Sequence, residues 1–535
     1  MPITQRVRIT STALVAVALI ALGVAGAAQA QGSSGSSKAQ AKARVIVAFK
    51  PGSDAAARAA INRAGGRVVV DLSEVNGLAV ELPASAVAAL RRNPNIEFIE
   101  DDPVRRVLGR PGPAVRRPAV LPGTPEAVPY GITMVQADQV SDVNVRNRKV
   151  CIIDSGIDRA HEDLQGLMNV DGTNLTTSGE WFTDENSHGT HVAGTVAAVD
   201  NTVGVIGVMP NRQIKLYIVK VFDAAGSASS STIASGMLAC LRAHANVVSM
   251  SLGGDRASRI ETRAADRLDR RGILVIAAAG NDGTTGVSYP AGFATVVSVA
   301  AIDSNMVVAG FSQKNPDVEL AAPGVGVLST IPVGIESAAT TVVGGVDYAV
   351  QAMVGSPRTS ATGPLADFGL GDTPVAGSMT GKVCLISRGN ISFADKVLNC
   401  QNSGGVAAII YNNAPGDIDG TLEPTVTNIP SVGTQQANGT LMLGQLGQST
   451  TVAVFPSPDA YAFFNGTSMA TPHVSGVAAL VWSYFLNCTA NEIRASLNNS
   501  ALDLGTTAGR DNEYGYGLVQ AKAAFDRIGS MGCGN

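Results

Sequence analysis

The chain has 535 residues, enough for more than one domain, and 45% of them are hydrophobic while only 15% are charged. The net charge of −4 and the mean hydropathy of +0.18 argue against a disordered or fibrous protein. They also argue against a nucleic-acid partner, and no polybasic patch for a membrane surface is visible. A compact protein with a large core is expected.

The first thirty residues have the features of a secretory signal peptide. Arg6 and Arg8 precede a charge-free run, residues 11–28, which ends in the small-residue pattern A-Q-A. A membrane anchor is the alternative, but this run is rich in Ala and Gly rather than strongly apolar. We therefore expect secretion, with no membrane contact after residues 1–30 are removed. A Gly/Ser/Ala/Gln-rich spacer covers residues 31–42.

Residues 43–107 are predicted to form a small α+β unit. The segments "RVIVAF", "GRVVVDL", "GLAVEL" and "NIEFIED" are typical of strands, and "DAAARAAINRAG" and "PASAVAALRRNP" are typical of helices. Their order, β-α-β-β-α-β, is that of a ferredoxin-like fold. The Pro- and Arg-rich residues 108–127 then predict an exposed linker that proteases can cut.

Near-continuous apolar runs alternate with helical segments from residue 128 onwards. The runs "KVCIID", "KLYIVKVF", "ANVVSMSL", "GILVIAAAG" and "ATVVSVAAI" are typical of strands covered on both faces. They predict a doubly wound, mainly parallel α/β sheet formed by residues 128–333 and 457–535. Reacting groups in such sheets gather beyond the carboxyl ends of the strands. Residues 334–456 interrupt this pattern as an inserted unit.

Six cysteines in an exported chain permit disulfides, and six cysteines allow 15 pairings. Cys384 and Cys400 are close in sequence within one later segment, and Cys488 and Cys533 both lie in the C-terminal part, so we expect these two pairs and, from the remainder, Cys151 with Cys240. A buried free thiol at Cys151 is the alternative.

Three polar side chains stand at the ends of predicted strands and helices. Asp154 is the first polar residue after the apolar run of residues 150–153, where it could also simply cap a turn. His188 falls in the first turn of a helix in "NSHGTHVAGTVAAV", which Asn186 or Ser187 can cap. Ser468, in "NGTSMATPHVSGVAAL", begins a long apolar helix, which is also an ordinary way for a helix to start.

These three residue types can perform nucleophilic catalysis together. A neutral imidazole can take a proton from a serine hydroxyl, and a carboxylate can fix the imidazole tautomer. The chain order Asp, His, Ser is one of three orders in which unrelated folds build this triad. Asn281, at the end of a buried strand, could hold the oxyanion together with the backbone N–H of Ser468, or it could merely form a turn. A zinc site at His188 and His191 is disfavoured, because no third ligand with convincing spacing follows.

Five motifs resemble the signatures of the subtilisin-like serine protease family: "CIIDSGID", "HGTHVAGT", "SLGG", "AAAGN" and "GTSMATPH". The resemblance covers about residues 128–332 and 459–526. It implies a triad of Asp154, His188 and Ser468, with Asn281 as the oxyanion residue. It also implies that substrate binds in a cleft as an added antiparallel strand. The implied substrate-binding residues are Gly226, Ser227 and Ala228 on one edge, Ser251, Leu252 and Gly253 on the other, and Ala278, Ala279 and Gly280 beside the P1 side chain.

The resemblance therefore implies a secreted serine endopeptidase that hydrolyses proteins and peptides through an acyl-enzyme. Small residues line the implied pocket and these motifs carry no acidic residue for a basic P1, so we expect broad specificity with a preference for large apolar or aromatic P1. We expect a monomer without a catalytic cofactor. The alternatives are a catalytically silent secreted binding protein on the same fold, and an esterase. The latter would require G-x-S-x-G and the order Ser, Asp, His.

A structural Ca²⁺ site is also implied, since a loop rich in oxygen donors with one or two carboxylates suits this ion. Glu126 stands where the family usually has glutamine, which puts that ligand in doubt, and a plain polar loop is the alternative. The other implied ligands are Asp163, the Asn201 side chain and the carbonyls of Val199, Val203 and Val205.

The two remaining units resemble known accessories of the family. Residues 43–107 resemble an inhibitory propeptide that assists folding and leads into the cleft. A cut between residues 103 and 128 would release the mature enzyme, with the pairs Arg105-Arg106 and Arg116-Arg117 as candidate sites. The insert of residues 334–456 resembles a mainly-β protease-associated (PA) domain near the rim of the cleft. Substrate docking and simple stabilisation are both open as its role.

Overall fold

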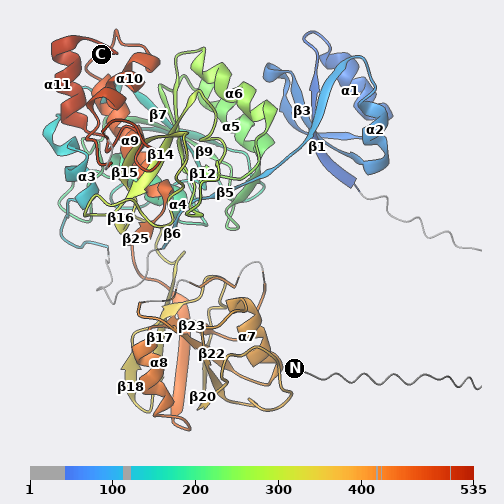
Figure 1. The fold of residues 1–535 in the computed structure, drawn as a ribbon, viewed down its shortest axis with the longest axis vertical. Coiled ribbons are helices and arrows are strands. Elements are labelled where there is room, and N and C mark those ends of the chain that lie inside the picture. Colours follow the sequence, from blue (N-terminus) through green and yellow to red (C-terminus); the bar gives the residue numbers. More distant parts are fainter. Residues whose placement is uncertain are drawn as a thin grey trace, which may run out of the picture. The chain divides into compact units, whose positions relative to one another are not determined.

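A computed structural model of the chain describes residues 42–111, 122–416, 418, 420–422, 425–505 and 508–534. The predicted signal peptide, most of the spacer and the pair Arg116-Arg117 lie outside these residues. Within the described part, no helix is long and apolar enough to cross a membrane. Figure 1 colours the chain along its sequence, with the first unit in blue and the insert in yellow to orange.

The first unit is a four-stranded antiparallel sheet with two helices, in the strand order β2-β3-β1-β4. Side chains alternate between the two faces of a strand, so Val45 and Val47 of β1 lie in the core of this unit while Ile46 and Ala48 join a larger apolar cluster that includes Ile260. The predicted element order is confirmed. The elements are β1 (Lys42–Phe49), α1 (Asp54–Arg63), β2 (Arg67–Leu72), β3 (Gly77–Pro83), α2 (Val87–Leu90) and β4 (Ile96–Asp101).

A seven-stranded parallel sheet forms the centre of the largest part, in the order β15-β14-β13-β11-β7-β9-β8 (Figure 1). The five predicted apolar runs contain β7, β9, β11, β13 and β14, so the doubly wound sheet is confirmed. The strands are β7 (Lys149–Asp154), β8 (Asn169–Asn174), β9 (Lys215–Lys220), β11 (Val247–Met250), β13 (Leu274–Ala278), β14 (Val296–Ile302) and β15 (Val318–Pro323).

Helices cover both faces of this sheet. Along β7, Val150 and Ile152 pack in one apolar cluster with α4 and α9, while Cys151 and Ile153 pack in another with α5 and α6. A strand buried on both faces must be apolar at every position, which explains the continuous runs. The helices are α3 (Tyr130–Met134), α4 (His188–Ala197), α5 (Ser230–Arg242), α6 (Arg259–Asp269), α9 (Thr467–Trp482), α10 (Ala490–Ser500) and α11 (Ala521–Met531).

Short strands complete the regions beside the sheet. They form two three-stranded sheets with the orders β10-β5-β12 and β16-β25-β6. Their bounds are β5 (Val104–Val107), β6 (Arg110–Pro111), β10 (Ser227–Ser229), β12 (Leu252–Gly253), β16 (Val327–Thr330) and β25 (Tyr461–Asn465).

The insert is mainly β, as expected, and its eight strands follow the order β18-β17-β24-β20-β21-β22-β23-β19. It contains β17 (Ser337–Val343), β18 (Val346–Tyr348), β19 (Gln351–Ala352), β20 (Ser360–Asp367), β21 (Val383–Ser387), α7 (Phe393–Asn402), β22 (Ala407–Tyr411), β23 (Ser431–Thr434), α8 (Gln436–Leu443) and β24 (Ser449–Pro456).

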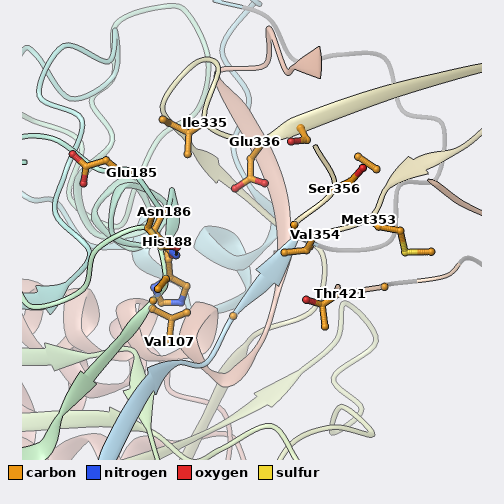
Figure 2. A pocket seen from close by; sticks show the side chains of 18 of the residues that line it. Val107, Glu185, Asn186, His188, Ile335, Glu336, Met353, Val354, Ser356 and Thr421 are labelled. Carbon is orange, nitrogen blue, oxygen red and sulfur yellow. Dashed lines mark hydrogen bonds between the residues drawn. The ribbon is translucent and has the colours of Figure 1, made fainter. Parts of the chain in front are cut away.

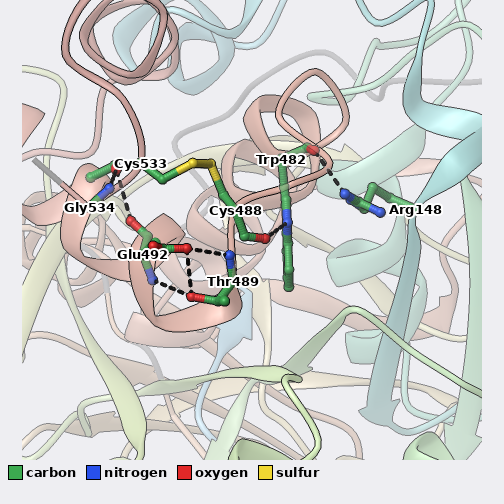
Figure 3. The surroundings of a disulfide bond; sticks show 8 residues. Arg148, Trp482, Cys488, Thr489, Glu492, Cys533 and Gly534 are labelled. Atoms are coloured by element: carbon green, nitrogen blue, oxygen red, sulfur yellow. Dashed lines mark hydrogen bonds between the residues drawn. A yellow bond between two sulfur atoms is a disulfide. The ribbon is translucent and has the colours of Figure 1, made fainter.

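Three disulfides bind elements to one another. They join β7 to α5, β21 to α7, and the end of the chain to the start of α10, as Figure 3 shows for the last. The alternative of a free thiol in β7 is therefore wrong. The bonded pairs are Cys151–Cys240, Cys384–Cys400 and Cys488–Cys533.

Candidate active site

Asp154 and His188 form a buried hydrogen-bonded pair between β7 and α4. Asp154 is the last residue of β7 and His188 is the first residue of α4. The Nδ1 atom of His188 lies 2.7 Å from Oδ1 of Asp154. Nε2 of His188 has no hydrogen-bond partner among the residues that the structure describes. The ring is thus oriented through Nδ1, and Nε2 is left for a reacting group.

The N-terminus of α4 is held by Asp184, which sequence reasoning missed. Its Oδ1 accepts hydrogen bonds from the N–H groups of Asn186 and Ser187, both at 3.0 Å, and its Oδ2 accepts from Thr190 N–H at 2.8 Å. Ser187, one of the two predicted caps, has a φ of 73° and makes no side-chain cap hydrogen bond, and the amide of the other, Asn186, donates to the Ala224 carbonyl instead. Burial raises the pKa of Asp184, while the hydrogen bonds from Thr190 oppose that shift.

The helix of His188 lies very close to the end of β7. Ser155 Oγ accepts a hydrogen bond from Gly189 N–H at 2.8 Å, and a Cβ atom on Gly189 would come within 2.2 Å of the Gly156 carbonyl oxygen. Only glycine permits this approach. Behind Asp154, the buried Lys220 donates to the Ser155 carbonyl at 2.5 Å and to Oε2 of Glu185 at 2.6 Å.

Ser468 is the second residue of α9, at the positive end of that helix. Its Oγ donates to the Ser251 carbonyl at 2.9 Å rather than to His188. The preceding Gly466 has a φ of 151°, and a Cβ atom there would lie 2.2 Å from the Leu108 carbonyl oxygen. The turn before Ser468 therefore needs glycine because another backbone approaches it.

That approaching backbone places a carbonyl between two hydrogen-bond donors. Asn281 Oδ1 accepts from the N–H and the hydroxyl of Thr467, at 2.9 and 2.8 Å, which fixes the amide orientation. Asn281 Nδ2 is thereby directed at the Leu108 carbonyl oxygen, to which it donates. Ser468 N–H donates to the same oxygen at 3.4 Å. Two donors thus converge on the carbonyl oxygen of a seated peptide bond, an arrangement that can stabilise an oxyanion.

The chain segment that carries Leu108 runs through the cleft as an added strand. β5 pairs antiparallel with β10 on one side and with β12 on the other. Val107 N–H donates to the Gly226 carbonyl at 3.1 Å, and Leu108 N–H donates to the Ser251 carbonyl at 3.3 Å. Beyond Gly109, β6 pairs with β25. The two predicted edges, residues 226–228 and 251–253, thus lie on opposite sides of this strand.

The remaining predicted substrate-binding residues lie at the end of β13. Ala278 and Ala279 are buried, and Gly280 N–H donates to the Thr467 hydroxyl oxygen at 3.2 Å. On β12, a Cβ atom on Gly253 would come within 2.7 Å of the Leu108 side chain. Because Gly253 has no side chain, the space beside it can hold a large apolar side chain such as that of Leu108.

A cavity of about 470 Å³ opens beside His188 and is lined in part by the insert. Figure 2 shows Val107 next to the His188 ring, and Glu336, Met353 and Thr421 on another side of the cavity. Burial raises the pKa of Glu336 to about 7. The insert thus contributes to the surroundings of the catalytic histidine candidate.

The alternative zinc pair is not formed. His191 Nε2 lies 3.0 Å from the Val327 carbonyl oxygen and 3.1 Å from that of Ala462, and its ring stacks on Phe464. Burial lowers the pKa of His191 to about 3. Nowhere in the described ranges do three His, Cys, Asp or Glu side chains gather as a metal site.

The predicted calcium ligands lie together, but they are arranged as a hydrogen-bonded loop. Asn201 Nδ2 donates to Asp163 Oδ1 at 2.9 Å, and Val205 N–H donates to Asp163 Oδ2 at 2.9 Å. Val203 N–H donates to Asn201 Oδ1 at 3.0 Å, and Val199 N–H donates to the Asp163 carbonyl at 3.0 Å. To ligate a cation, the Asn201 amide must turn over, which would also end the hydrogen bond that Asn201 Oδ1 accepts from Val203 N–H.

Glu126, the doubtful ligand, binds the backbone of the same loop. Its Oε1 accepts hydrogen bonds from Asn201 N–H at 2.8 Å and Thr202 N–H at 3.0 Å. Glu126 therefore holds this loop through two backbone N–H groups.

Three family models match the chain. The subtilase family model matches residues 146–366 and 406–517, the PA domain model matches residues 350–442, and the model of the fervidolysin N-terminal prodomain matches residues 27–101. The first of these covers more than half of the chain.

Individual relatives agree with these matches. Subtilisin DY of Bacillus licheniformis is 44% identical over 213 residues, which is 39% of this chain and 76% of the relative. M-protease of Shouchella clausii is 33% identical over 84% of this chain and 78% of its own length. The crystal structure of the psychrophilic subtilisin-like protease Apa1 from Pseudoalteromonas sp. AS-11 is 42% identical, with a TM-score of 0.53, over 76% of this chain and 99% of that one. The chain is a member of the subtilase family, a serine endopeptidase with an N-terminal prodomain and an inserted PA domain.

Proposed function

We propose that Asp154, His188 and Ser468 act as the catalytic triad of this endopeptidase, with Asn281 and the Ser468 N–H as its oxyanion hole. One observation carries the proposal: a carbonyl of the chain's own strand lies between both oxyanion donors, next to the buried Asp–His pair.

The reaction needs one small movement of Ser468. Rotation about its Cα–Cβ bond takes the hydroxyl away from the Ser251 carbonyl and towards His188 Nε2. The Ser251 carbonyl keeps a hydrogen bond, because Leu108 N–H also donates to it. His188 then takes the proton as Oγ bonds to the carbonyl carbon, and the negative oxygen is held by Asn281 and the Ser468 N–H. His188 next returns the proton to the departing amine, and water hydrolyses the acyl-enzyme with His188 again as base.

The seated peptide bond supports Leu108–Gly109 as the maturation site. Its carbonyl occupies the oxyanion hole, and a Cβ atom on Gly109 would lie 2.8 Å from His188 Nε2, the atom that would protonate the leaving amine. This bond lies within the expected linker but at neither arginine pair. Leucine at P1 also supports the expected preference for large apolar P1 residues, and a P1′ residue larger than glycine would crowd His188.

The experiment compares the wild-type chain with Ser468→Ala. The wild type is expected to cleave itself to give a mature N-terminus at Gly109, to be labelled by a fluorophosphonate at Ser468, and to digest casein. Removing the nucleophile from a subtilisin, the family to which this chain belongs, lowers kcat by about 10⁶, a borrowed magnitude. Self-cleavage or casein digestion retained by Ser468→Ala, measured by N-terminal sequencing and peptide release, would refute the triad.

We further propose export of the enzyme and a structural Ca²⁺ at the loop of Asp163 and Asn201. Three disulfides and the N-terminal sequence pattern support export. The gathered oxygen donors support Ca²⁺, with the Asn201 amide turned over. EDTA is expected to lower the Tm of the Ser468→Ala chain, and added Ca²⁺ to restore it. An unchanged Tm in EDTA would show that the loop is a plain polar one.

A further inference from the structure

A buried arginine–glutamate pair lies in the substrate cleft, three residues before the seated Leu108. Arg105 and Glu261 are both fully buried. Arg105 Nε donates to Glu261 Oε1 at 3.2 Å and Nη2 donates to Oε2, so the contact is bidentate. Nη2 also donates to the Arg256 carbonyl at 2.8 Å. With Leu108 at P1, Arg105 is the P4 residue.

Arg105 is the one residue of β5 whose side chain is fully buried. Arg105 lies opposite Ala228 of β10, whereas its neighbours Val104 and Arg106 are exposed. Space for the guanidinium depends on Gly254, where a Cβ atom would come within 3.0 Å of Arg105 Nη1. Carboxylate, carbonyl and glycine together form a subsite shaped for a guanidinium.

Helix capping does not account for the Glu261 carboxylate. Glu261 is the third residue of α6, and its N–H donates to the N-cap Ser258 hydroxyl at 3.3 Å. In a complete capping box the carboxylate returns to the N-cap N–H, as Glu492 does to Thr489 in α10. Both carboxylate oxygens of Glu261 instead accept from Arg105.

A buried ion pair contributes little net stability, because both ions lose their hydration. The larger effect of the pair is to discriminate between substrates by their P4 residue, because an apolar P4 side chain would leave the Glu261 carboxylate without a hydrogen-bond donor. The positive end of α6 offsets part of the cost of burying this carboxylate when the cleft is empty. We infer that the S4 subsite of this enzyme selects arginine through Glu261, so that preferred substrates carry Arg at P4 and an apolar residue at P1. This inference rests on the proposed function.

Two isomeric, internally quenched peptides test the inference on the mature enzyme. One contains R-A-V-L-G-S, with Arg at P4, and the other contains A-R-V-L-G-S, with Arg at P3. Their composition is identical, so only the register differs. We expect kcat/KM to be at least about tenfold higher for Arg at P4, with Lys at P4 between the two because an ammonium cannot bond bidentately.

Variants of Glu261 test whether this residue causes the preference for Arg at P4. Glu261→Gln is expected to reduce the P4 preference to within about twofold, and Glu261→Asp to retain part of the preference. Glu513→Gln, which removes a half-exposed carboxylate paired with Lys314, is the matched control and should retain the full preference.

The outcomes separate the two proposals. Equal cleavage of both isomers by wild type, or a P4 preference that survives Glu261→Gln, overturns the S4 inference while casein digestion still stands. Loss of casein digestion and of both peptide activities in correctly folded wild type overturns the proposed function instead. Thermal unfolding of each variant shows whether a lost preference reflects lost folding.

Discussion

At the scale of single residues, the proposed chemistry depends on groups that hold the reacting atoms in place. Asn281 can donate to a substrate carbonyl only because Thr467 supplies two donors to its other amide atom. In the proposed reaction Thr467 would therefore be a positioning residue that acts through Asn281.

Thr467→Val removes one of those two donors while it preserves the shape of the side chain. A neutral hydrogen bond contributes about 0.5–1.5 kcal/mol, so we expect kcat to fall by up to about tenfold with KM nearly unchanged. Asn281→Ala should cost more, about 10²–10³ in kcat, a magnitude borrowed from a subtilisin of the same family. Thr467→Ser, which keeps the hydroxyl, is the control. Equal steady-state constants for the Val and Ser variants would contradict the positioning role.

At the scale of elements, the end of the prodomain supplies N-caps to two helices of the catalytic part. Asp102 accepts hydrogen bonds from Ser231 N–H at 2.9 Å, from the Ser231 hydroxyl at 2.6 Å and from the Ser230 hydroxyl at 3.1 Å, all at the start of α5. Glu100 accepts from Arg259 N–H and Ile260 N–H, both at 3.1 Å, at the start of α6. These helix ends would lose their partners on release of the prodomain.

Asp102→Asn should therefore weaken the bound prodomain. Hydrogen bonds to a charged group contribute about 1.5–3 kcal/mol, so we expect the cleaved prodomain to dissociate at least about tenfold faster. The lag before casein activity appears after self-cleavage would measure this. Asp101→Asn is the matched control, because Asp101 is largely exposed and pairs with Arg256 at the surface. Equal lags for the two variants would show that the helix caps do not hold the prodomain.

Elements with a strong local pattern could be predicted from sequence, while contacts between distant elements could not. The continuous apolar runs identified five strands of the parallel sheet, and the spacing of the cysteines suggested all three disulfides. The cap at Asp184, the role of Thr467 and the pair of Arg105 with Glu261 were missed. The last pair joins residues 156 positions apart, and only the register of β5 in the cleft turns Arg105 inward. The position of the Leu108 carbonyl between its two donors likewise depends on the register of β5 and could not be predicted from sequence.

At the scale of the whole molecule, the insert is attached by two chain segments that bond to each other. Gly334 N–H donates to the Ser457 carbonyl at 2.9 Å, and Ser457 N–H donates to the Glu336 carbonyl at 2.8 Å. The pairing continues on one side as β16 with β25 and on the other as β17 with β24. Glu336 therefore lies where the insert joins the catalytic part, and its carboxyl faces the cavity beside His188 (Figure 2).

Titration of Glu336 should make the stability of the chain depend on pH. Burial raises the pKa of Glu336 to about 7, and the Asp184 carboxylate adds to the rise, while the nearby Ser187 hydroxyl and the charge of Arg358 oppose it. The folded chain thus holds this proton more tightly than the unfolded chain, whose glutamate has its ordinary pKa near about 4.3. The stabilisation is complete below about pH 4.3, declines as the pH rises to about 7, and is constant above that pH.

Glu336→Gln, made in the Ser468→Ala chain to prevent self-digestion, should remove this decline. We expect similar Tm values for the two chains near pH 5, and a Tm of the Glu336→Gln chain that is about 1–3 °C higher at pH 8. This corresponds to about 1–2 kcal/mol, less than the full shift because the carboxyl is partly exposed. Glu513→Gln, also made in the Ser468→Ala chain, is the control, because it removes a carboxylate that lies away from the cavity. Parallel Tm curves for the Glu336→Gln chain and its parent between pH 5 and 8 would mean that Glu336 is ionised throughout. The junction between insert and catalytic part would then not respond to pH through this carboxyl.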